Sequence, residues 1–149
     1  MVEVIIGVAI ILVIAGGVTF SLTGFRSSQD LDDVAREIAA ALRNAQSRSR
    51  ANDNGQIWGV YFSNNNSQAP TYAVFKGATI PPAAGDIMGN YSLLGTVRFG
   101  SPGAGADDGV TFAALTGLPS AEKTIQIVLR RDATKTRTII INANGTISY

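Results

Sequence analysis

The first 25 residues contain a long run of uncharged, mostly apolar side chains. Residues 4–24 include no Asp, Glu, Lys or Arg. At the helical rise of 1.5 Å per residue, a run of about 21 residues is about 31 Å long, which matches a hydrocarbon core of about 30 Å. The run is longer than the core of a cleaved secretory signal and lacks its basic start. We therefore predict a retained helix in residues 1–25 that can span a bilayer.

One carboxylate, Glu3, stands at the start of this apolar run. A carboxylate in or beside hydrocarbon is costly unless water or a cation reaches it. The first basic residue is Arg26, at the far end of the predicted helix, which is too distant to pair with Glu3. Glu3 is therefore solvated among lipid headgroups, protonated, or paired with another molecule.

The composition excludes several kinds of site. The 149-residue chain contains no cysteine and no histidine and has a formal net charge of +1. It can therefore form no disulfide, thiolate nucleophile, Cys or His zinc site, or Ser-His-Asp triad. The near-neutral charge argues against bulk electrostatic binding to nucleic acid. Because no pair of carboxylate, lysine or tyrosine side chains suggests catalysis either, we expect no enzyme activity, no cofactor and no metal.

Residues 26–55 have the pattern of an amphipathic helix. Aspartates crowd its first turns and arginines its last turns, as the helix dipole favours. We expect one long helix over residues 1–55 that bends or loosens near Gly16, Gly17 or Gly24. Its apolar side chains recur at spacings of three and four, at Leu31, Val34, Ala35, Ile38, Leu42 and Ala45.

From residue 56 onward the apolar pattern has a period of two. The segments between the apolar runs, including residues 77–90, are rich in turn-forming residues and are predicted loops. Residues 56–149 thus predict an antiparallel β-sheet head, whose inner face covers the apolar stripe of the helix. Its runs of β-branched and aromatic residues are 57–62, 71–75, 91–99, 109–115, 124–130, 137–142 and 146–149.

Two charged segments of the head are candidate binding sites. In one, Asp107 and Asp108 are either calcium ligands or an ordinary acidic loop, and they lack the alternating ligand spacing of a calcium loop. In the other, a cluster of cations is either a nucleic-acid contact or a solvated turn. The cations of this candidate nucleic-acid site are Arg130, Arg131, Lys135 and Arg137.

The sequence resembles the type IV pilins and the type II secretion pseudopilins. The similarity is strongest in MVEVIIGVAIILVI and in the helix LDDVAREIAAALRNAQSRSRANDNGQ. The segments DDGVTFAALTGLP, IQIVLRR and TIIINANGTISY are similar in layout to the GspH/FimT class of minor pseudopilins. The resemblance implies an α+β fold in which a long N-terminal helix, with a transmembrane half and an amphipathic half, packs on a C-terminal antiparallel sheet.

The resemblance also implies a function. Glu3 falls where the family carries a glutamate that is thought to meet the N-terminal amine of a neighbouring subunit in a helical filament. The chain would be a structural subunit of a type IV pilus-like filament, a single-pass membrane protein before assembly and part of a cell-surface filament or periplasmic pseudopilus afterwards. Implied partners are other copies of the chain, an inner-membrane assembly platform, an assembly ATPase and a prepilin peptidase. The expected assembly residues are Glu3, Val4, Ile5, Ile6, Val8, Ile11, Leu12 and Ile14.

Two other classes of function stay open. A minor pilin or pseudopilin with the same fold would act as a binding module at a filament tip, for DNA uptake, adhesion or a secreted substrate. A membrane-anchored enzyme is the third class, although no nucleophile and base are visible as a pair.

Overall fold

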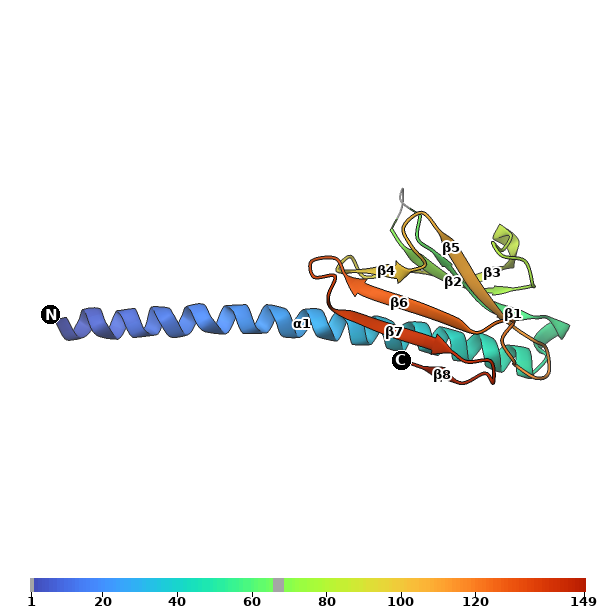
Figure 1. Ribbon diagram of the computed structural model, residues 1–149, viewed down its shortest axis with the longest axis horizontal. Coiled ribbons are helices and arrows are strands. Elements are labelled where there is room, and N and C mark those ends of the chain that lie inside the picture. Colours follow the sequence, from blue (N-terminus) through green and yellow to red (C-terminus); the bar gives the residue numbers. More distant parts are fainter. Residues whose placement is uncertain (1, 66–68) are drawn as a thin grey trace.

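The computed structural model describes residues 2–65 and 69–149, and for residues 12–27 it describes the helical backbone without the side chains. A single helix, α1 (Val2–Arg50), is followed by a β-rich head (Figure 1). Two short 3-10 turns, η1 (Asp53–Gly55) and η2 (Ala84–Asp86), lie in the connections. The strands are β1 (Trp58–Ser63), β2 (Thr71–Lys76), β3 (Ile87–Ser92), β4 (Val97–Ser101), β5 (Asp107–Phe112), β6 (Lys123–Leu129), β7 (Thr136–Ile141) and β8 (Ile147–Ser148).

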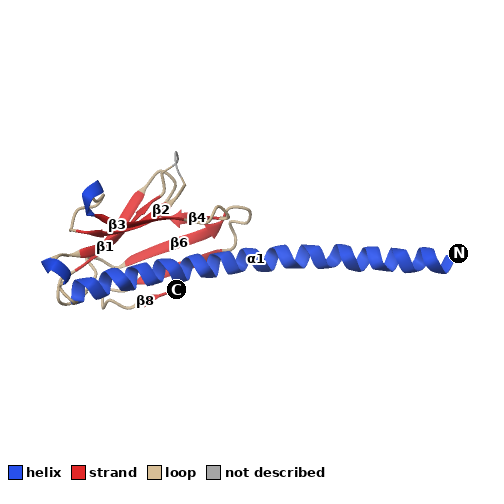
Figure 2. Cartoon of the chain, turned by 180° about the vertical axis from the view of Figure 1, so that it is seen from behind, coloured by secondary structure: helices blue, strands red, loops and turns tan. Residues whose placement is uncertain are grey.

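The two halves of α1 have different surroundings. The C-terminal half lies along the head, whereas the N-terminal half extends beyond it (Figures 1 and 2). The helix ends at Arg50, a few residues before the predicted end at residue 55. The reason is Asn52, whose φ of 52° is a left-handed conformation that stops a helix and that Asn tolerates.

The structure does not test the membrane-spanning part of the prediction. Within the part of the chain that the structure describes, no helix combines the length and the apolar character needed to cross a membrane. Residues 12–27, which include the second half of the predicted span and Gly16, Gly17 and Gly24, are described only as helical backbone. The span and the bend at these glycines stay predictions.

The strands form two four-stranded antiparallel sheets, not the single sheet that we predicted. The first has the order β3-β2-β1-β5, with Val60 opposite both Val74 and Val110. The second has the order β4-β6-β7-β8, with Ile125 opposite Ile139. A period of two predicts which side chains of a strand share a face, but it does not predict which strands pair.

Strand β3 occupies a segment for which we predicted mostly a loop. Residues 87–90 fall within the predicted loop, and the predicted run 91–99 is divided between β3 and β4. Gly89 and Asn90 were misleading because both residue types are rare in strands. An edge strand tolerates them, and Gly89 leaves room for the Tyr91 ring, since a Cβ at position 89 would lie 2.8 Å from the Tyr91 hydroxyl oxygen.

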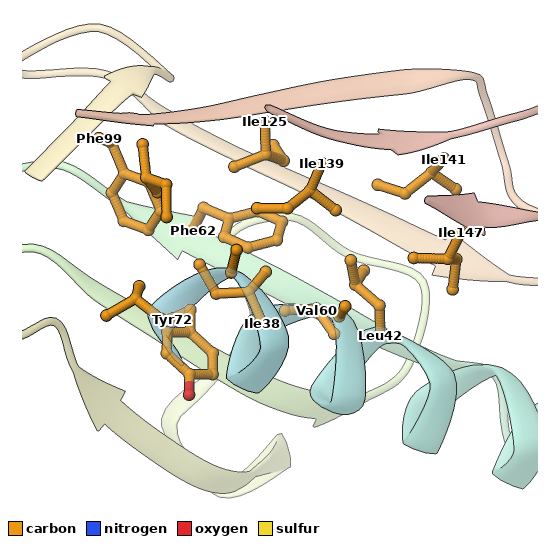
Figure 3. Packing of buried hydrophobic residues seen from close by; sticks show 14 of the residues in the cluster. Ile38, Leu42, Val60, Phe62, Tyr72, Phe99, Ile125, Ile139, Ile141 and Ile147 are labelled. Atoms are coloured by element: carbon orange, nitrogen blue, oxygen red, sulfur yellow. The ribbon is translucent and has the colours of Figure 1, made fainter. Parts of the chain in front are cut away.

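One hydrophobic core lies between α1 and the two sheets. Every residue of the predicted helix stripe is buried, with at most 2% exposed, which confirms that prediction. Figure 3 shows Ile38 and Leu42 of α1 among side chains of both sheets. The rings of Phe62 and Phe99, one from each sheet, meet edge to face at 5.8 Å. The helix and both sheets therefore share a single core, which holds the stem and the head together.

Candidate functional site

The N-terminal segment of α1 exposes apolar side chains on all of its faces. No described part of the head covers residues 2–11, which lie far from the sheets (Figure 1). A helix that is apolar all round is normally buried in a larger assembly or in lipid. Apolar side chains that are at least 52% exposed on this segment are Val2, Val4, Ile5, Ile6, Val8, Ile10 and Ile11.

The predicted assembly residues divide into two groups. Those of the first group lie on this exposed segment, whereas the side chains of Leu12 and Ile14 lie outside the described part of the chain. The first group consists of Glu3, Val4, Ile5, Ile6, Val8 and Ile11.

Glu3 lies in the first turn of α1, where the helix dipole stabilises a negative charge. Its side chain is exposed, and it forms no ion pair with any side chain that the structure describes. Within this part of the chain, the carboxylate is therefore available to a cation from another molecule.

Two polar contacts hold α1 to the head where the helix leaves it. The Thr96 hydroxyl donates a 2.8 Å hydrogen bond to Asp30 Oδ2, and Arg137 Nε donates to Asp32 Oδ1. Asp32 also stands four positions before Arg36 on α1, a spacing that allows an ion pair within a helix. The tertiary structure pairs it with a residue more than one hundred positions away, which the local pattern could not predict.

The predicted basic cluster lies on the turn between β6 and β7. Arg130, Arg131 and Lys135 are exposed there, whereas Arg137 is committed to the ion pair with α1. Asp132 shapes the turn, because its Oδ1 accepts hydrogen bonds from the Thr134 amide at 3.1 Å and the Thr134 hydroxyl at 2.6 Å. These two bonds, and the nearby charge of Lys135, hold the pKa of Asp132 below its usual value. The structure thus brings three of the four predicted cations together, and nucleic-acid binding by them stays a prediction.

The two aspartates of the acidic loop both have protein partners. Ser63 Oγ donates to Asp107 at 2.8 Å, and Lys123 Nζ lies 2.6 Å from Asp108 Oδ1. Burial, together with a hydrogen bond to Asp107, raises the pKa of Tyr61. Among the described residues, no three Asp, Glu, His or Cys side chains gather in a way that could hold a metal ion. Both aspartates lie at the start of β5 and not in a loop, and their contacts favour a structural role over calcium binding.

Gln46 is a buried polar residue of α1 that sequence reasoning missed. Its Nε2 donates to the carbonyls of Gly117 at 3.0 Å and Gly145 at 2.8 Å, which lie in two different turns of the head. Beside it, Arg50 Nε donates to the Thr116 carbonyl, and a Cβ on Gly117 would lie 2.5 Å from Arg50 Cγ. Gln46 thus joins the end of α1 to the β5–β6 connection and to the β7–β8 turn.

Replacing Gln46 with alanine is expected to lower the free energy of unfolding by about 1–3 kcal/mol, because two buried carbonyls lose their donor. Urea denaturation of the full chain in detergent micelles measures this change. The matched control is Asn44→Ala on the exposed face of the same helix, which should change stability by about 0.5 kcal/mol or less. Equal losses in the two variants would contradict the structural role of Gln46.

Tyr72 lies in the core with its hydroxyl turned away from the labelled aliphatic side chains (Figure 3). Its ring stacks on that of Tyr91 at a centroid distance of 5.1 Å. Burial and then the negative charge of Glu37 raise the pKa of Tyr72 from 10.0 to about 12. Because folding favours the neutral phenol, its contribution to stability is complete below pH 10 and is lost as the pH rises to about 12.

The free energy of unfolding is therefore expected to fall by about 2–3 kcal/mol between pH 10 and 12 through this group alone. Denaturation curves recorded across this interval, for the native chain and for Tyr72→Phe, isolate the contribution. The phenylalanine variant should lose that part of the pH dependence, whereas Tyr149→Phe, at an exposed position, should retain it. An unchanged slope in Tyr72→Phe would contradict the assignment.

The combination of a long helix, half packed on antiparallel sheets and half free, agrees with solved structures. A crystal structure of the Pseudomonas aeruginosa type IV minor pilin FimU has a TM-score of 0.60 over 83% of this chain and 90% of that one, at 15% sequence identity. The chain has the type IV pilin fold. A second crystal form of the same pilin has a TM-score of 0.55 over 79% of this chain and 90% of that one, at 16% identity. No protein-family model and no curated protein matches the sequence.

The pilin fold confirms the predicted class, a long N-terminal helix packed on antiparallel β-structure. In this pilin-like chain, the exposed helix segment and the head are distinct surfaces. The first is apolar and carries Glu3, and the second carries the basic turn and the groove described below.

Proposed function

We propose that this protein is a subunit of a type IV pilus-like extracellular filament that assembles through its N-terminal helix. The observation that carries the proposal is the exposed apolar surface of residues 2–11, which extends from a well-packed head. Such a surface is costly in water, at about 25 cal/mol per Å² of apolar area. Parallel helices of neighbouring subunits would remove it from water.

The same apolar surface serves in two environments in this proposal. Before assembly it lies in the lipid of the membrane, and after assembly it packs against neighbouring helices. Because both environments are apolar, transfer between them avoids exposure to water. The assembly platform and the ATPase expected from the resemblance would act on this transfer, whereas the prepilin peptidase would process the N-terminus.

Glu3 gives the helix bundle its register in this proposal. Its carboxylate would pair with the N-terminal amine of a neighbouring subunit, and no other described side chain pairs with it. Leaving a buried carboxylate unpaired costs several kcal/mol, so a shifted neighbour is disfavoured.

A minor subunit at the filament tip is the second candidate function. The likeness to FimU, a protein described as a minor pilin, favours it. A minor subunit would use the same helix contacts, but its head would bind DNA, a surface or a secreted substrate. The two functions differ in the number of copies per filament and in their position.

Cryo-electron microscopy of filaments sheared from the producing cells tests both candidates. A structural subunit should repeat along the filament body, with its helix in the core and Glu3 near a neighbour's N-terminus. Density at the tip alone would support the minor subunit. Filaments that contain no copy of the chain, from cells that produce it, would contradict both.

A further inference from the structure

A groove of about 490 Å³ lies between α1 and the edge of the first sheet. One wall is the exposed face of α1, with Glu37, Ala41 and Asn44, and the other is formed by Tyr72 of β2 and Tyr91 of β3. Strand β3 is the edge strand of its sheet, so the groove is open on that side.

The two ends of the groove differ in charge. Arg48 at one end already has partners, since Nε donates to Asn44 Oδ1 at 3.0 Å and the guanidinium lies 4.5 Å from the Trp58 ring centroid. Glu37 at the other end has no ion pair among the described side chains. A free carboxylate beside stacked tyrosines is a receptor for a guanidinium or ammonium group, which can bond to the carboxylate and lie on a ring.

Suitable cations lie elsewhere on the same chain. Arg130 and Arg131 lie exposed on the β6–β7 turn, and neither guanidinium has a hydrogen-bond or ion-pair partner among the side chains that the structure describes. The hydrogen bonds from Thr134 to Asp132 shape the turn that carries them. The turn belongs to the second sheet and the groove to the first, so the two surfaces are at different places on one head.

The axial positions of the two surfaces indicate how copies of the chain could meet. The Arg130 amide donates to the Thr96 carbonyl at 2.9 Å, and the Thr96 hydroxyl donates to Asp30, so the turn is level with Asp30. Glu37 lies further along the helix by about 10 Å at 1.5 Å per residue. A parallel neighbour displaced by about that distance along the helix axis brings its basic turn level with Glu37.

We propose that the β6–β7 turn of one subunit binds the Glu37 groove of a second copy of this chain, with Arg130 or Arg131 against Glu37 and the tyrosine pair. The inference rests on the proposed function, because it requires parallel helices. A contact between two different surfaces that also displaces each copy along the helix axis cannot close into a ring, so it repeats along an open helical filament. The positive charges of the turn and the negative charge at the Glu37 end of the groove make the second copy the fitting occupant.

A charge exchange tests this contact in cells that make filaments. Glu37→Arg alone and Arg130→Glu with Arg131→Glu should each reduce the yield of sheared filaments about five-fold or more, because like charges then face each other. All three substitutions in one chain should restore most of the yield, because every subunit carries both surfaces. Glu122→Arg, at an exposed position on the β5–β6 connection, is the control and should leave the yield unchanged.

The absence of cysteine allows an independent test by cross-linking. Glu37→Cys with Arg131→Cys in one chain should form a ladder of covalent multimers in oxidised filaments, whereas Glu122→Cys with Arg131→Cys should not. Normal yields in the charge variants together with no ladder would overturn the contact, and loss of DNA binding in those variants would assign the turn to nucleic acid instead. Failure of the native chain to form filaments would contradict the proposed function itself.

Discussion

Replacing Glu3 with alanine should reduce filament assembly at least about tenfold, because misregistered and correctly registered neighbours then differ little in energy. In the proposed bundle the Glu3 carboxylate is the one acidic group in an apolar segment. It favours the axial position at which the N-terminal amine of the neighbouring subunit lies close enough to pair with it. Sheared filaments quantified by immunoblot and negative-stain microscopy measure the effect. Glu3→Gln, which keeps the shape but removes the charge, should behave in the same way.

The Glu3 experiment needs a control for folding. The head packs without any contribution from Glu3, so circular dichroism and the melting temperature of the head should be unchanged in Glu3→Ala. Glu122→Ala removes a carboxylate from an exposed position of the head and should assemble normally. Filaments of normal number and diameter from Glu3→Ala would count against pairing as the source of register.

Replacing Ile139 with alanine should lower the free energy of unfolding by about 2–5 kcal/mol. Ile139 of β7 is fully buried in the core between α1 and the second sheet, where Figure 3 places it near Ile125. Alanine removes apolar contacts and leaves a cavity that the surrounding side chains fill only in part. Urea denaturation of the full chain in detergent micelles measures the loss.

The next residue of the same strand provides a matched control. Ile140 points to the other face of the sheet and is 38% exposed, so Ile140→Ala should cost about 1 kcal/mol or less. Both variants remove the same atoms from the same strand, and they differ only in burial. Similar losses would mean that β-propensity, and not the shared core, dominates the stability of β7.

Periodicity predicted the parts of the fold that depend on neighbouring residues along the chain. The spacing of Ile38 and Leu42 predicted the buried face of α1, and the runs of β-branched and aromatic residues from residue 56 onward predicted a β-rich head. Strand β3 was missed because its Gly89 and Asn90 have low strand propensity, and pairing with β2 outweighs that preference.

The same distinction between local and long-range features applies to the candidate site. The apolar segment with Glu3 and the basic turn are continuous in sequence, so composition alone identified them. The groove was not predictable, because Glu37, Tyr72 and Tyr91 come from three separate elements. No local pattern distinguishes a carboxylate beside two stacked rings from an ordinary exposed glutamate.

The sequence by itself determined the long apolar helix, its amphipathic continuation and the β-rich head, because helix and strand patterns and turn residues act between near neighbours. Only the tertiary structure decided the division into two sheets, the pairing of Asp32 with Arg137 and the placement of Gln46 between two turns. These features arise when apolar faces from distant segments enclose one core, and the polar side chains then bond to whatever that packing brings within reach.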